Sequence, residues 1–552
     1  MPVSSPLHVR WLGRVPYREA LAVQYGIFDH GKQQHLLLLE HPHVFTYGPS
    51  TNLENNLRCI PAQVGAELVQ VQRGGDITYH GPGQLVGYPL LSLAAKHGKS
   101  GPADTRSYVQ GIEQLIIDVL AECGINNSGR LGEYPGVWID PHGSSPRKIC
   151  AIGVRLGRGS TDRRTMHGFA LNVNTDLAYM RKHIVPCGIE KYAVTSLTDE
   201  GVNKTMEEVV DIVARLAAKQ WGGGDSDRYD VAWHHRPEDL SAFSRGKGAG
   251  LPVRMLQRLE QAGVTSGLSV SARKPEWLRP HVNHDKDVLQ VKRTLRDFQL
   301  VTVCEEAGCP NLSECWSEGT ATFMVLGESC TRACGFCLID TRKPLAPDTD
   351  EPRRVAEVIQ RMGLKYAVLT MVARDDLQDG GMQHVVDCLR EIRALCPDTL
   401  IETLISDVKG SDALEILIAD RPDVLNHNIE TVARLQRAVR PSAGYARSLS
   451  VLARSRRAGL TTKSGMIVGM GESVDEVEAT LVDLASVGVQ IVTIGQYLRP
   501  TMNHLPVARW VEPAEFEHYR EVGTALGMDH VESSPLTRSS YHARQALEYA
   551  RL

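Results

Sequence analysis

The second half of the chain alternates short apolar stretches with longer amphipathic ones, and this rhythm constrains the fold more than any other feature. Beyond Lys274 we expect five strand–helix pairs, at 367–370 and 384–395, 400–405 and 412–419, 424–428 and 432–439, 462–468 and 474–486, and 491–494 and 513–526. Alternating strands and helices favour parallel sheets, because two parallel strands need a long crossover connection. The sequence therefore predicts an α/β domain whose parallel sheet is closed or partly closed into a barrel.

The first part of the chain predicts a different, mixed α/β domain. We expect a strand at 7–12, a helix at 17–31, a buried strand at 34–39 and a long helix at 107–123. The run GGGDSD at 222–227 breaks this pattern, and a stretch rich in Arg, Gly and Ser follows through 244–250. We therefore expect a first domain at 1–225, a linker at 226–270 with a short helix at 251–262, and a second domain at 271–552, which suits a chain of 552 residues.

Composition excludes several classes of partner. The chain has 61 Lys and Arg against 65 Asp and Glu, so the net charge of -4 indicates neither a nucleic acid nor an anionic membrane as its partner. The longest aliphatic runs are a few residues, far short of the roughly 20 that span a bilayer. Twelve cysteines in a long chain without a secretory signal favour free thiols in a reducing compartment, so we expect a cytoplasmic protein.

Six of the cysteines crowd into 34 residues and predict a metal centre. They form C-x4-C-x5-C at Cys304, Cys309 and Cys315 and then C-x3-C-x2-C at Cys330, Cys334 and Cys337. Structural zinc usually takes four ligands from paired C-x2-C units, which two sets of three fit poorly. A cubane iron–sulfur cluster with three protein thiolates leaves one iron open for another ligand. The spacing therefore favours iron–sulfur clusters over zinc.

The C-x3-C-x2-C motif resembles the radical S-adenosylmethionine (SAM) superfamily, whose domains are partial (β/α) barrels. The runs NLSECWSEGTATFMVLGESCTRACGFC, NHNIET, TKSGMIVGMGE, IGQYLRPT and RSSYHA sharpen the match, and 275–552 resembles the lipoyl synthase family. That family removes hydrogen at C6 and C8 of a protein-bound octanoyl chain and inserts sulfur at both carbons. The resemblance therefore implies SAM, two 4Fe–4S clusters and a low-potential electron donor such as ferredoxin or flavodoxin.

The resemblance also implies roles for individual residues. Cys330, Cys334 and Cys337 would bind the radical-generating cluster, and the auxiliary cluster, which gives up its sulfur, would take Cys304, Cys309, Cys315 and Ser540. Near the cofactor we expect Asn428, Glu430, Gly469 and Glu472, which could equally be ordinary barrel residues.

In the first domain the residues themselves suggest acyl transfer. A thiolate is a strong nucleophile at neutral pH, and a neighbouring ammonium favours it, so a Cys–Lys pair could pass an acyl group through a thioester. Among the four cysteines there, Cys187 lies between Pro and Gly on a predicted loop, whereas Cys150 suits a buried strand. The Gly-rich run 73–84 can approach a ligand closely.

The runs RGGDITYHGPGQ, YPGVWI, KICAIGVR, HGFALNVN and PCGI make 7–220 similar to the lipoyl(octanoyl)transferase family, which has the fold of biotin and lipoate protein ligases. The resemblance makes Cys187 the nucleophile that takes octanoate from acyl carrier protein, and Lys148 the base. It places in the acyl pocket Arg73, Gly74, Gly75, Asp76, Ile77, Thr78, Tyr79, His80, Ala151, Ile152, Gly153, Gly168, Phe169 and Ala170. The sequence departs from the family at 45–49.

The two resemblances describe consecutive steps, because the product of the first activity is the substrate of the second. Together they imply a bifunctional lipoate biosynthesis enzyme acting on lipoyl domains of 2-oxoacid dehydrogenase subunits and on the glycine-cleavage carrier protein. Two alternatives remain open at this point. One is a zinc-stabilised protein that binds acylated domains without chemistry. The other is an ATP-dependent lipoate ligase fused to a different radical enzyme, such as a methylthiotransferase.

Overall fold

The computed structural model describes residues 6–94, 103–157, 163–233, 257–265, 267–269, 272–279, 298, 311, 315, 319–408 and 412–551. The chain divides into two compact units, Met1–Trp233 and His234–Leu552.

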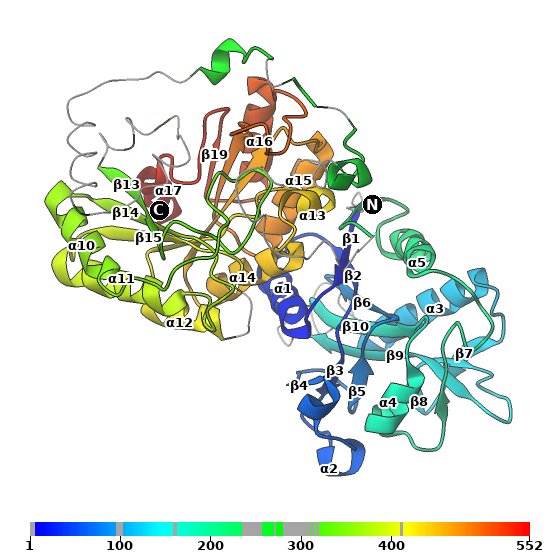
Figure 1. Ribbon diagram of the computed structural model, residues 1–552. Helices are drawn as coiled ribbons and strands as arrows, with labels where there is room; N and C mark the ends of the chain where they lie inside the picture. The colour runs from blue at the N-terminus through cyan, green and yellow to red at the C-terminus, as the bar shows by residue number, and fades with distance from the viewer. Residues whose placement is uncertain are drawn as a thin grey trace. The chain divides into compact units, whose positions relative to one another are not determined.

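The first unit is built on a mixed sheet, which has nine strands among the described residues (Figure 1). Its strands are β1 (Leu7–Arg14), β2 (His35–Glu40), β6 (Gln84–Leu90), β7 (Ser128–Leu131), β8 (Tyr134–Ile139), β9 (Arg147–Leu156), β10 (Thr165–Asn172), β11 (Ala193–Val194) and β12 (Ser226–Asp230). They lie in the order β12-β1-β2-β6-β10-β9-β8-β7, and β11 pairs with β9. A smaller sheet joins β3 (Val44–Tyr47) to β4 (Glu67–Gln70) and β5 (Thr78–His80).

Helices cover the large sheet and complete the core of the first unit. They are α1 (Tyr17–His30), α3 (Thr105–Glu122) and α5 (Met206–Trp221). The helices α2 (Leu53–Asn56) and α4 (Leu177–His183) pack instead around Phe45 of the smaller sheet. Leu36 and Leu38 of β2 pack in one buried cluster with Ile112 of α3 and Val210 of α5, because alternate residues of a strand point to the same face. The strands and helices that the sequence predicts in this unit are confirmed.

Part of the predicted linker belongs to the compact units. Residues 226–230 form β12, which runs parallel to β1. This edge strand was not predicted because its sequence, SDRYD, is polar. Its Asp227 forms ion pairs with His8 and Arg10 of β1. At the other end, 257–261 are helical, and Leu268 donates its amide hydrogen to the Val507 carbonyl of the second unit at 2.7 Å.

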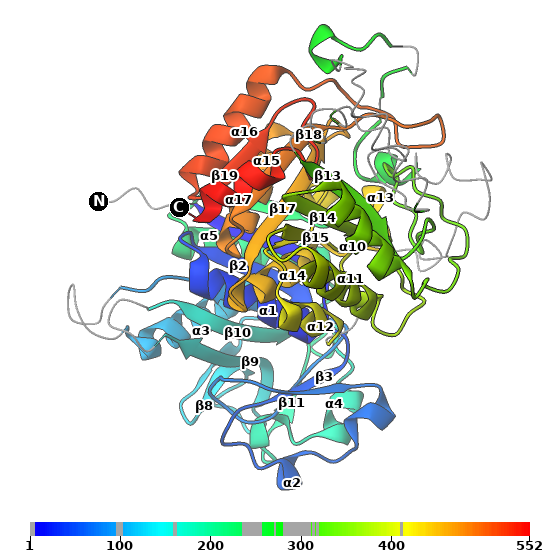
Figure 2. The ribbon, with the colours of Figure 1, turned by 90° about the vertical axis from the view of Figure 1, so that its left-hand side faces the viewer.

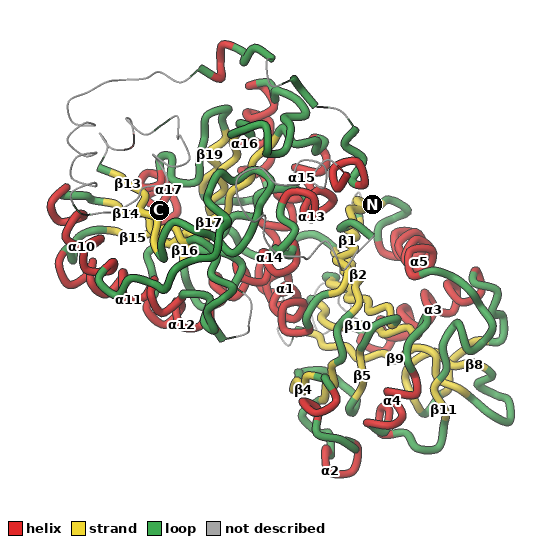
Figure 3. Tube along the Cα trace, viewed as in Figure 1, coloured by secondary structure: helices red, strands yellow, loops and turns green. Residues whose placement is uncertain are grey.

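The second unit contains seven parallel strands in chain order among the residues described (Figure 3). They are β13 (Thr320–Val325), β14 (Tyr366–Met371), β15 (Leu400–Leu404), β16 (Val424–Asn426), β17 (Thr461–Val468), β18 (Ile491–Gln496) and β19 (His530–Ser533). Every neighbouring pair is parallel, as the alternation of strands and helices predicts. Within the described ranges β13 and β19 end the sheet without pairing with each other, so the barrel is partial.

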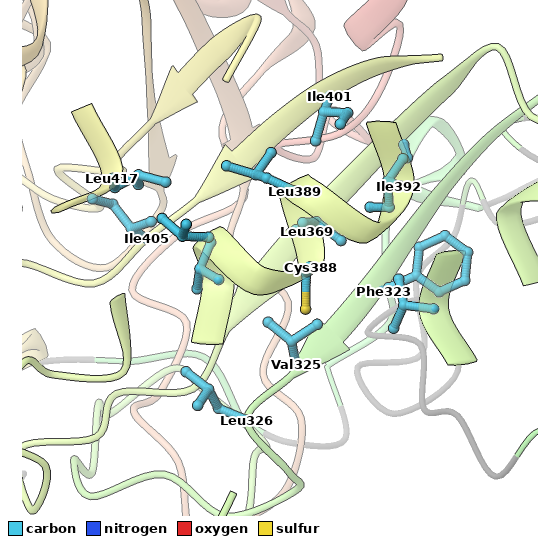
Figure 4. Packing of buried hydrophobic residues seen from close by; sticks show 14 of the residues in the cluster. Phe323, Val325, Leu326, Leu369, Cys388, Leu389, Ile392, Ile401, Ile405 and Leu417 are labelled. Atoms are coloured by element: carbon cyan, nitrogen blue, oxygen red, sulfur yellow. The ribbon is translucent and has the colours of Figure 1, made fainter. Parts of the chain in front are cut away.

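Helices line the outside of this sheet (Figure 2). They are α10 (Glu351–Met362), α11 (Met382–Leu395), α12 (Ala413–Asp420), α14 (Tyr445–Arg457), α15 (Val474–Ser486) and α16 (Pro513–Ala525). The short helix α13 (Gln436–Val439) follows β16, and α17 (Ala543–Arg551) packs at the amino ends of the strands instead. The helix predicted at 432–439 is a short 3₁₀ turn followed by α13. The helix that packs on β17 is α14, whose four arginines obscure its apolar face. In the core, Cys388 of α11 points toward Val325 of β13 (Figure 4).

The inside of the partial barrel is closed at the amino ends of its strands. Leu547 of α17 packs against Tyr366 and Val424, which begin β14 and β16. One layer higher, Lys463 binds Glu402 with both Nζ–O distances at 3.1 Å, and both residues are fully buried. The carboxyl ends of the strands are therefore the end available to a site, as in other barrels of parallel strands.

Candidate active sites

A cavity of about 450 Å³ lies in the first unit between the Gly-rich loop and strands β9 and β10. Most of the predicted pocket residues line it: Arg73, Gly74, Gly75, Asp76, Thr78, His80, Ala151, Ile152, Gly153, Gly168, Phe169 and Ala170. Cys187 and Lys148 line the same cavity, and Val86, Val109 and Ile189 add apolar wall. Its size and apolar walls suit a small apolar ligand.

Two predicted pocket residues lie elsewhere. Ile77 and Tyr79 are fully buried in a separate cluster with Phe45 and Ile184. The segment 77–80 is extended, so its side chains alternate, and Thr78 and His80 face the cavity instead. The pocket predicted from the sequence is corrected at these two positions.

Arg73 holds the Gly-rich loop in shape. Its Nη1 donates to the Asp76 carbonyl at 2.9 Å, and its Nη2 donates to the carbonyl oxygen and Oγ1 of Thr46 at 2.9 and 3.0 Å. A Cβ added to Gly48 would lie 2.8 Å from the Gly75 carbonyl oxygen, so glycine is required for this approach. The segment 45–49, where the sequence departs from the transferases, thus packs against the Gly-rich loop through Thr46 and Gly48.

Cys187 sits on a 3₁₀ turn, Pro186–Gly188, and has a left-handed backbone with φ of 57°. This conformation costs free energy for any residue but glycine and is held here by a hydrogen bond from the Cys187 amide to the Ile77 carbonyl at 2.9 Å. The side chain is partly exposed, and the Nζ of Lys148 lies 3.6 Å from its Sγ. The fold thus brings together the two residues that the sequence singled out.

The side chain of Lys148 reaches the sulfur by passing Gly136 and Trp138, two residues that the sequence analysis did not identify as part of the site. The residue is 7% exposed, and its Nζ lies 5.4 Å from the Trp138 ring centroid. A Cβ added to Gly136 would lie 2.7 Å from Cε of Lys148 and 2.5 Å from the Cys150 carbonyl oxygen. Gly136 also has φ of 128°, which disfavours other residues. The signal was present, since Gly136 is the glycine of YPGVWI.

The other cysteines of the first unit have packing roles. Cys123 and Cys150 are buried in the main core, and Cys59 packs at the edge of the cluster around Phe45. Burial raises the pKa of all three thiols. In the described part of the chain, none of them lines the cavity.

His167 lines the cavity and was also missed by the sequence analysis. It is 2% exposed and has φ of 59°, and neither ring nitrogen has a hydrogen-bond partner among the described residues. Burial lowers the pKa of its imidazole to about 3, so the ring is neutral at physiological pH. It is the first residue of HGFALNVN. This stretch of the cavity wall, with Tyr17, His80 and Tyr88, is therefore polar.

In the second unit, Cys330, Cys334 and Cys337 lie on the loop that follows β13. The Cys330 amide donates to the Asp340 carbonyl at 2.7 Å, and the Gly335 amide donates to the Val439 carbonyl at 2.8 Å. Arg332 is 6% exposed and forms ion pairs with Asp375 and Asp407 beyond the ends of β14 and β15. The loop is therefore fixed at the carboxyl ends of the strands.

The three thiols of this loop are buried candidate ligands. In the ranges that the structure describes, no three His, Cys, Asp or Glu side chains converge as the ligands of one metal ion do. Thiolates around a cubane stand at different corners and need not converge. Burial is the main reason that the pKa of each thiol is raised, that of Cys334 to about 11, and both other thiols add to the rise at Cys337. Cys330 and Cys334 therefore lie near enough to Cys337 to affect the pKa of its thiol.

The other cysteine motif is only partly visible. Cys304 and Cys309 lie outside the described residues, whereas Cys315 is buried. One turn before it, Asn311 donates from Nδ2 to the Leu536 carbonyl at 2.8 Å, in the same terminal loop as Ser540. Ser540 is partly exposed.

The predicted cofactor residues gather at the ends of β16 and β17. Glu472 accepts hydrogen bonds from the amides of Gly469 and Met470, so it shapes its own loop. Asn428 donates from Nδ2 to Oε1 of Glu430 at 3.0 Å, and the Glu430 amide donates to the Gly465 carbonyl of β17. Burial raises the pKa of both carboxyls. The sequence analysis missed Arg440, which lies beside Cys334 and donates to the Asn428 carbonyl at 3.1 Å.

Comparison with known proteins identifies both units. Residues 16–217 match the lipoyl protein ligase A/B catalytic domain, and 324–484 match the radical SAM superfamily. The lipoyl synthase of Rubrobacter xylanophilus is 51% identical over 281 residues, which are 50% of this chain and 88% of that protein. The chain belongs to the lipoyl synthase family. The lipoyl synthase of Chlorobaculum parvum is also 51% identical, over 49% of this chain and 94% of that protein.

Among solved structures, a bipartite lipoate protein ligase from Thermoplasma acidophilum shares 19% identity with a TM-score of 0.33 over 42% of this chain and 88% of that one. This likeness is too weak to bear on the fold.

The lipoyl synthase unit and the ligase-type unit together make the chain a fused lipoate biosynthesis enzyme, with transferase and sulfurtransferase activities. Membership of the lipoyl synthase family implies SAM and iron–sulfur clusters, and the ligase-type domain implies lipoyl domains as substrates. The zinc-binding alternative and the methylthiotransferase alternative are therefore wrong for the second unit. No helix within the described ranges is long and apolar enough to cross a membrane.

Proposed function

We propose that the first unit transfers octanoate from acyl carrier protein to a lysine of a lipoyl carrier domain, through a thioester on Cys187. The observation that carries this proposal is the 3.6 Å contact between Nζ of Lys148 and Sγ of Cys187 at the wall of a partly apolar cavity. An ATP-dependent ligase activates its acid as an adenylate and needs no such thiol, so this pair favours transfer from a thioester.

The reaction would proceed in two acyl-transfer steps at Cys187. The Cys187 thiolate, whose proton Lys148 has taken, attacks the octanoyl carbonyl; the bond to the carrier's sulfur breaks, and that sulfur leaves as a thiol with the proton from Lys148. The octanoyl chain lies along Ile152 and Phe169. The amine of the acceptor lysine then attacks the Cys187 thioester, an amide forms, and Lys148 takes the proton as Cys187 is released.

For the second unit we propose insertion of two sulfur atoms at C6 and C8 of the protein-bound octanoyl chain. Cys330, Cys334 and Cys337 would hold a 4Fe–4S cluster, which supplies the electron that cleaves SAM into methionine and the radical that abstracts hydrogen. Asn428, Glu430, Gly469 and Glu472 would border the SAM site. The fixed loop around Arg332 would keep the three thiolates in place while substrate binds.

We further propose that Cys304, Cys309, Cys315 and Ser540 hold a second 4Fe–4S cluster. The hydrogen bond between Asn311 and Leu536 supports this assignment, because it brings the Cys315 segment to the terminal loop. Ser540 lies on the same terminal loop and is partly exposed, so its hydroxyl can reach an added ligand.

Several partners follow from this chemistry. The acceptors would be lipoyl domains of 2-oxoacid dehydrogenase subunits and the glycine-cleavage carrier protein. The electron would come from a ferredoxin or flavodoxin. The ten cysteines that the structure describes are free thiols, which suits the cytoplasm.

One reconstitution tests the whole proposal. The chain, with its clusters restored anaerobically, is given octanoyl acyl carrier protein, an apo lipoyl domain, SAM and a reductant without ATP, and the domain is weighed by mass spectrometry. We expect the octanoyl adduct first and the dithiolane afterwards. An adduct that forms only from free octanoate and ATP would instead make the first unit a ligase.

A further inference from the structure

The terminal loop that carries RSSYHA contacts a strand end at the proposed SAM site. Oγ of Ser539 accepts a hydrogen bond of 2.7 Å from Nδ2 of Asn428. Ser539 directly precedes Ser540, for which we propose a role in the auxiliary cluster. The two neighbouring serines therefore have different proposed contacts: Ser539 with Asn428, and Ser540 with the auxiliary cluster.

The bond to Ser539 orients the Asn428 amide. Its Nδ2 also donates to Oε1 of Glu430, and an ionised carboxylate can only accept, so the amide nitrogen must face these two oxygens. Oδ1 then points toward Gly465, where an added Cβ would lie 2.6 Å from it. Gly465 thus leaves room in front of this oxygen.

Oδ1 of Asn428 is a buried acceptor without a donor. The residue is 8% exposed, and Oδ1 has no hydrogen-bond partner within the described ranges. Buried amide oxygens are normally paired, because an unpaired one loses its hydration without compensation. Such an oxygen at the carboxyl end of β16 indicates a ligand that brings an O–H or N–H group.

The loop that holds Ser539 is itself fixed to the barrel. The Gln496 amide donates to the Pro535 carbonyl at 3.2 Å, and the Ser534 amide donates to the Ile494 carbonyl at 3.2 Å. Gly495 permits this packing, since a Cβ there would lie 2.0 Å from the Thr537 carbonyl oxygen. Ser539 is therefore a well-anchored acceptor.

We propose that Ser539 is a positioning residue for SAM, which holds the Asn428 amide so that its Oδ1 accepts a hydrogen bond from a hydroxyl or amine of the cofactor. This inference rests on the proposed radical SAM function of the second unit. It separates the two serines of RSSYHA: Ser539 serves the SAM site, and Ser540 serves the auxiliary cluster.

The test compares Ser539→Ala, Ser539→Thr and Ser540→Ala in the full chain with its clusters restored. Two quantities are measured without turnover: the Kd for SAM by equilibrium dialysis, and the iron bound per chain. We expect Ser539→Ala to weaken SAM binding about five- to tenfold, the effect of one hydrogen bond, with wild-type iron content. Threonine keeps the hydroxyl and should restore the Kd to within about twofold, whereas Ser540→Ala should lose the iron of one cluster.

The proposal is overturned if Ser539→Ala binds SAM as the wild type does, or if it loses iron as Ser540→Ala does, since the serine would then serve the auxiliary cluster. A wild-type chain that takes up iron but binds no SAM would sink the proposed radical function along with this inference. Full iron content in Ser540→Ala contradicts the auxiliary assignment alone, and the Kd of Ser539→Ala still decides the role of Ser539.

Discussion

At the scale of single residues, the first unit depends on the sulfur of Cys187. We expect Cys187→Ser to lower octanoyl transfer by at least about a thousandfold, because a serine hydroxyl is a far weaker nucleophile than a thiolate at neutral pH. Mass spectrometry of the acceptor domain measures the rate. The matched control is Cys59→Ser, which changes a partly exposed thiol outside the cavity. Equal losses in the two variants would contradict the role of Cys187.

Gly136 offers a second prediction at this scale. Gly136→Ala places a Cβ 2.7 Å from Cε of Lys148 and 2.5 Å from the Cys150 carbonyl oxygen, so the lysine must move. We expect a loss in kcat of roughly a hundredfold, since displacement of a catalytic group by about 1 Å costs that much. Gly132→Ala, in the turn between β7 and β8, meets nothing within 4 Å and should retain the wild-type rate. Wild-type transfer by Gly136→Ala would show that Lys148 needs no fixed passage.

At the scale of elements, the ion pair of Lys463 and Glu402 joins β17 to β15 inside the barrel. Lys463→Met leaves a buried carboxylate without its counter-charge, and we expect a loss of about 3–5 kcal/mol in the free energy of unfolding of the second unit. Adding Glu402→Gln removes that charge and should recover more than half of the loss. Chemical denaturation measures both variants.

An exposed pair provides the control for this prediction. Arg353 and Glu357 lie one helical turn apart on α10, with side chains 74% and 37% exposed. Arg353→Met should change the free energy of unfolding by no more than about 0.5 kcal/mol. If the double variant is no more stable than Lys463→Met alone, unpaired charge is not the cause of the loss.

The end of the predicted linker behaves as an element of the second unit. Leu259 is 2% exposed, and Arg434 donates both to the Ala262 carbonyl and to the Gly471 carbonyl of the loop after β17. We expect Leu259→Asp to release this segment and to raise its cleavage by trypsin, at Arg258, at least about tenfold, because a buried charge opposes packing. Glu260→Gln, on the exposed side, should be cleaved as the wild type is. Equal cleavage of both variants would mean that the segment is not packed.

At the scale of the whole molecule, the chain places consecutive activities on one polypeptide. A protease site inserted within 234–256 would separate the units after folding. We expect each activity to persist after the cut, while the coupled rate falls modestly at low carrier concentration, since tethering raises the effective concentration of the second site. The uncut chain with the same insertion is the control. An unchanged coupled rate would exclude handover through the tether.

Some elements and residues were predictable because their signals are local. The helix at 474–486 has a capping box at Ser473 and Glu476 and a regular apolar face, so α15 was predicted to the residue. Cys187 was distinguished from Cys150 by its neighbours alone. In contrast, α14 and β12 were not predicted, because their many arginines and acidic residues hide the apolar pattern of a packed element. In the folded protein these charged residues form ion pairs with other elements, such as Arg228 with Asp211 and Arg454 with Glu415.

The amino-acid sequence by itself determined the two α/β domains and the cysteine motifs, because periodicity and motif spacing lie within short stretches of chain. Its resemblance to the transferases made Cys187 and Lys148 candidates. Only the tertiary structure decided which of these side chains meet. The passage opened by Gly136, the turn of Ile77 and Tyr79 away from the cavity, and the bond between Ser539 and Asn428 join residues far apart in sequence. Such contacts depend on how strands and loops are brought together, and no local pattern encodes that.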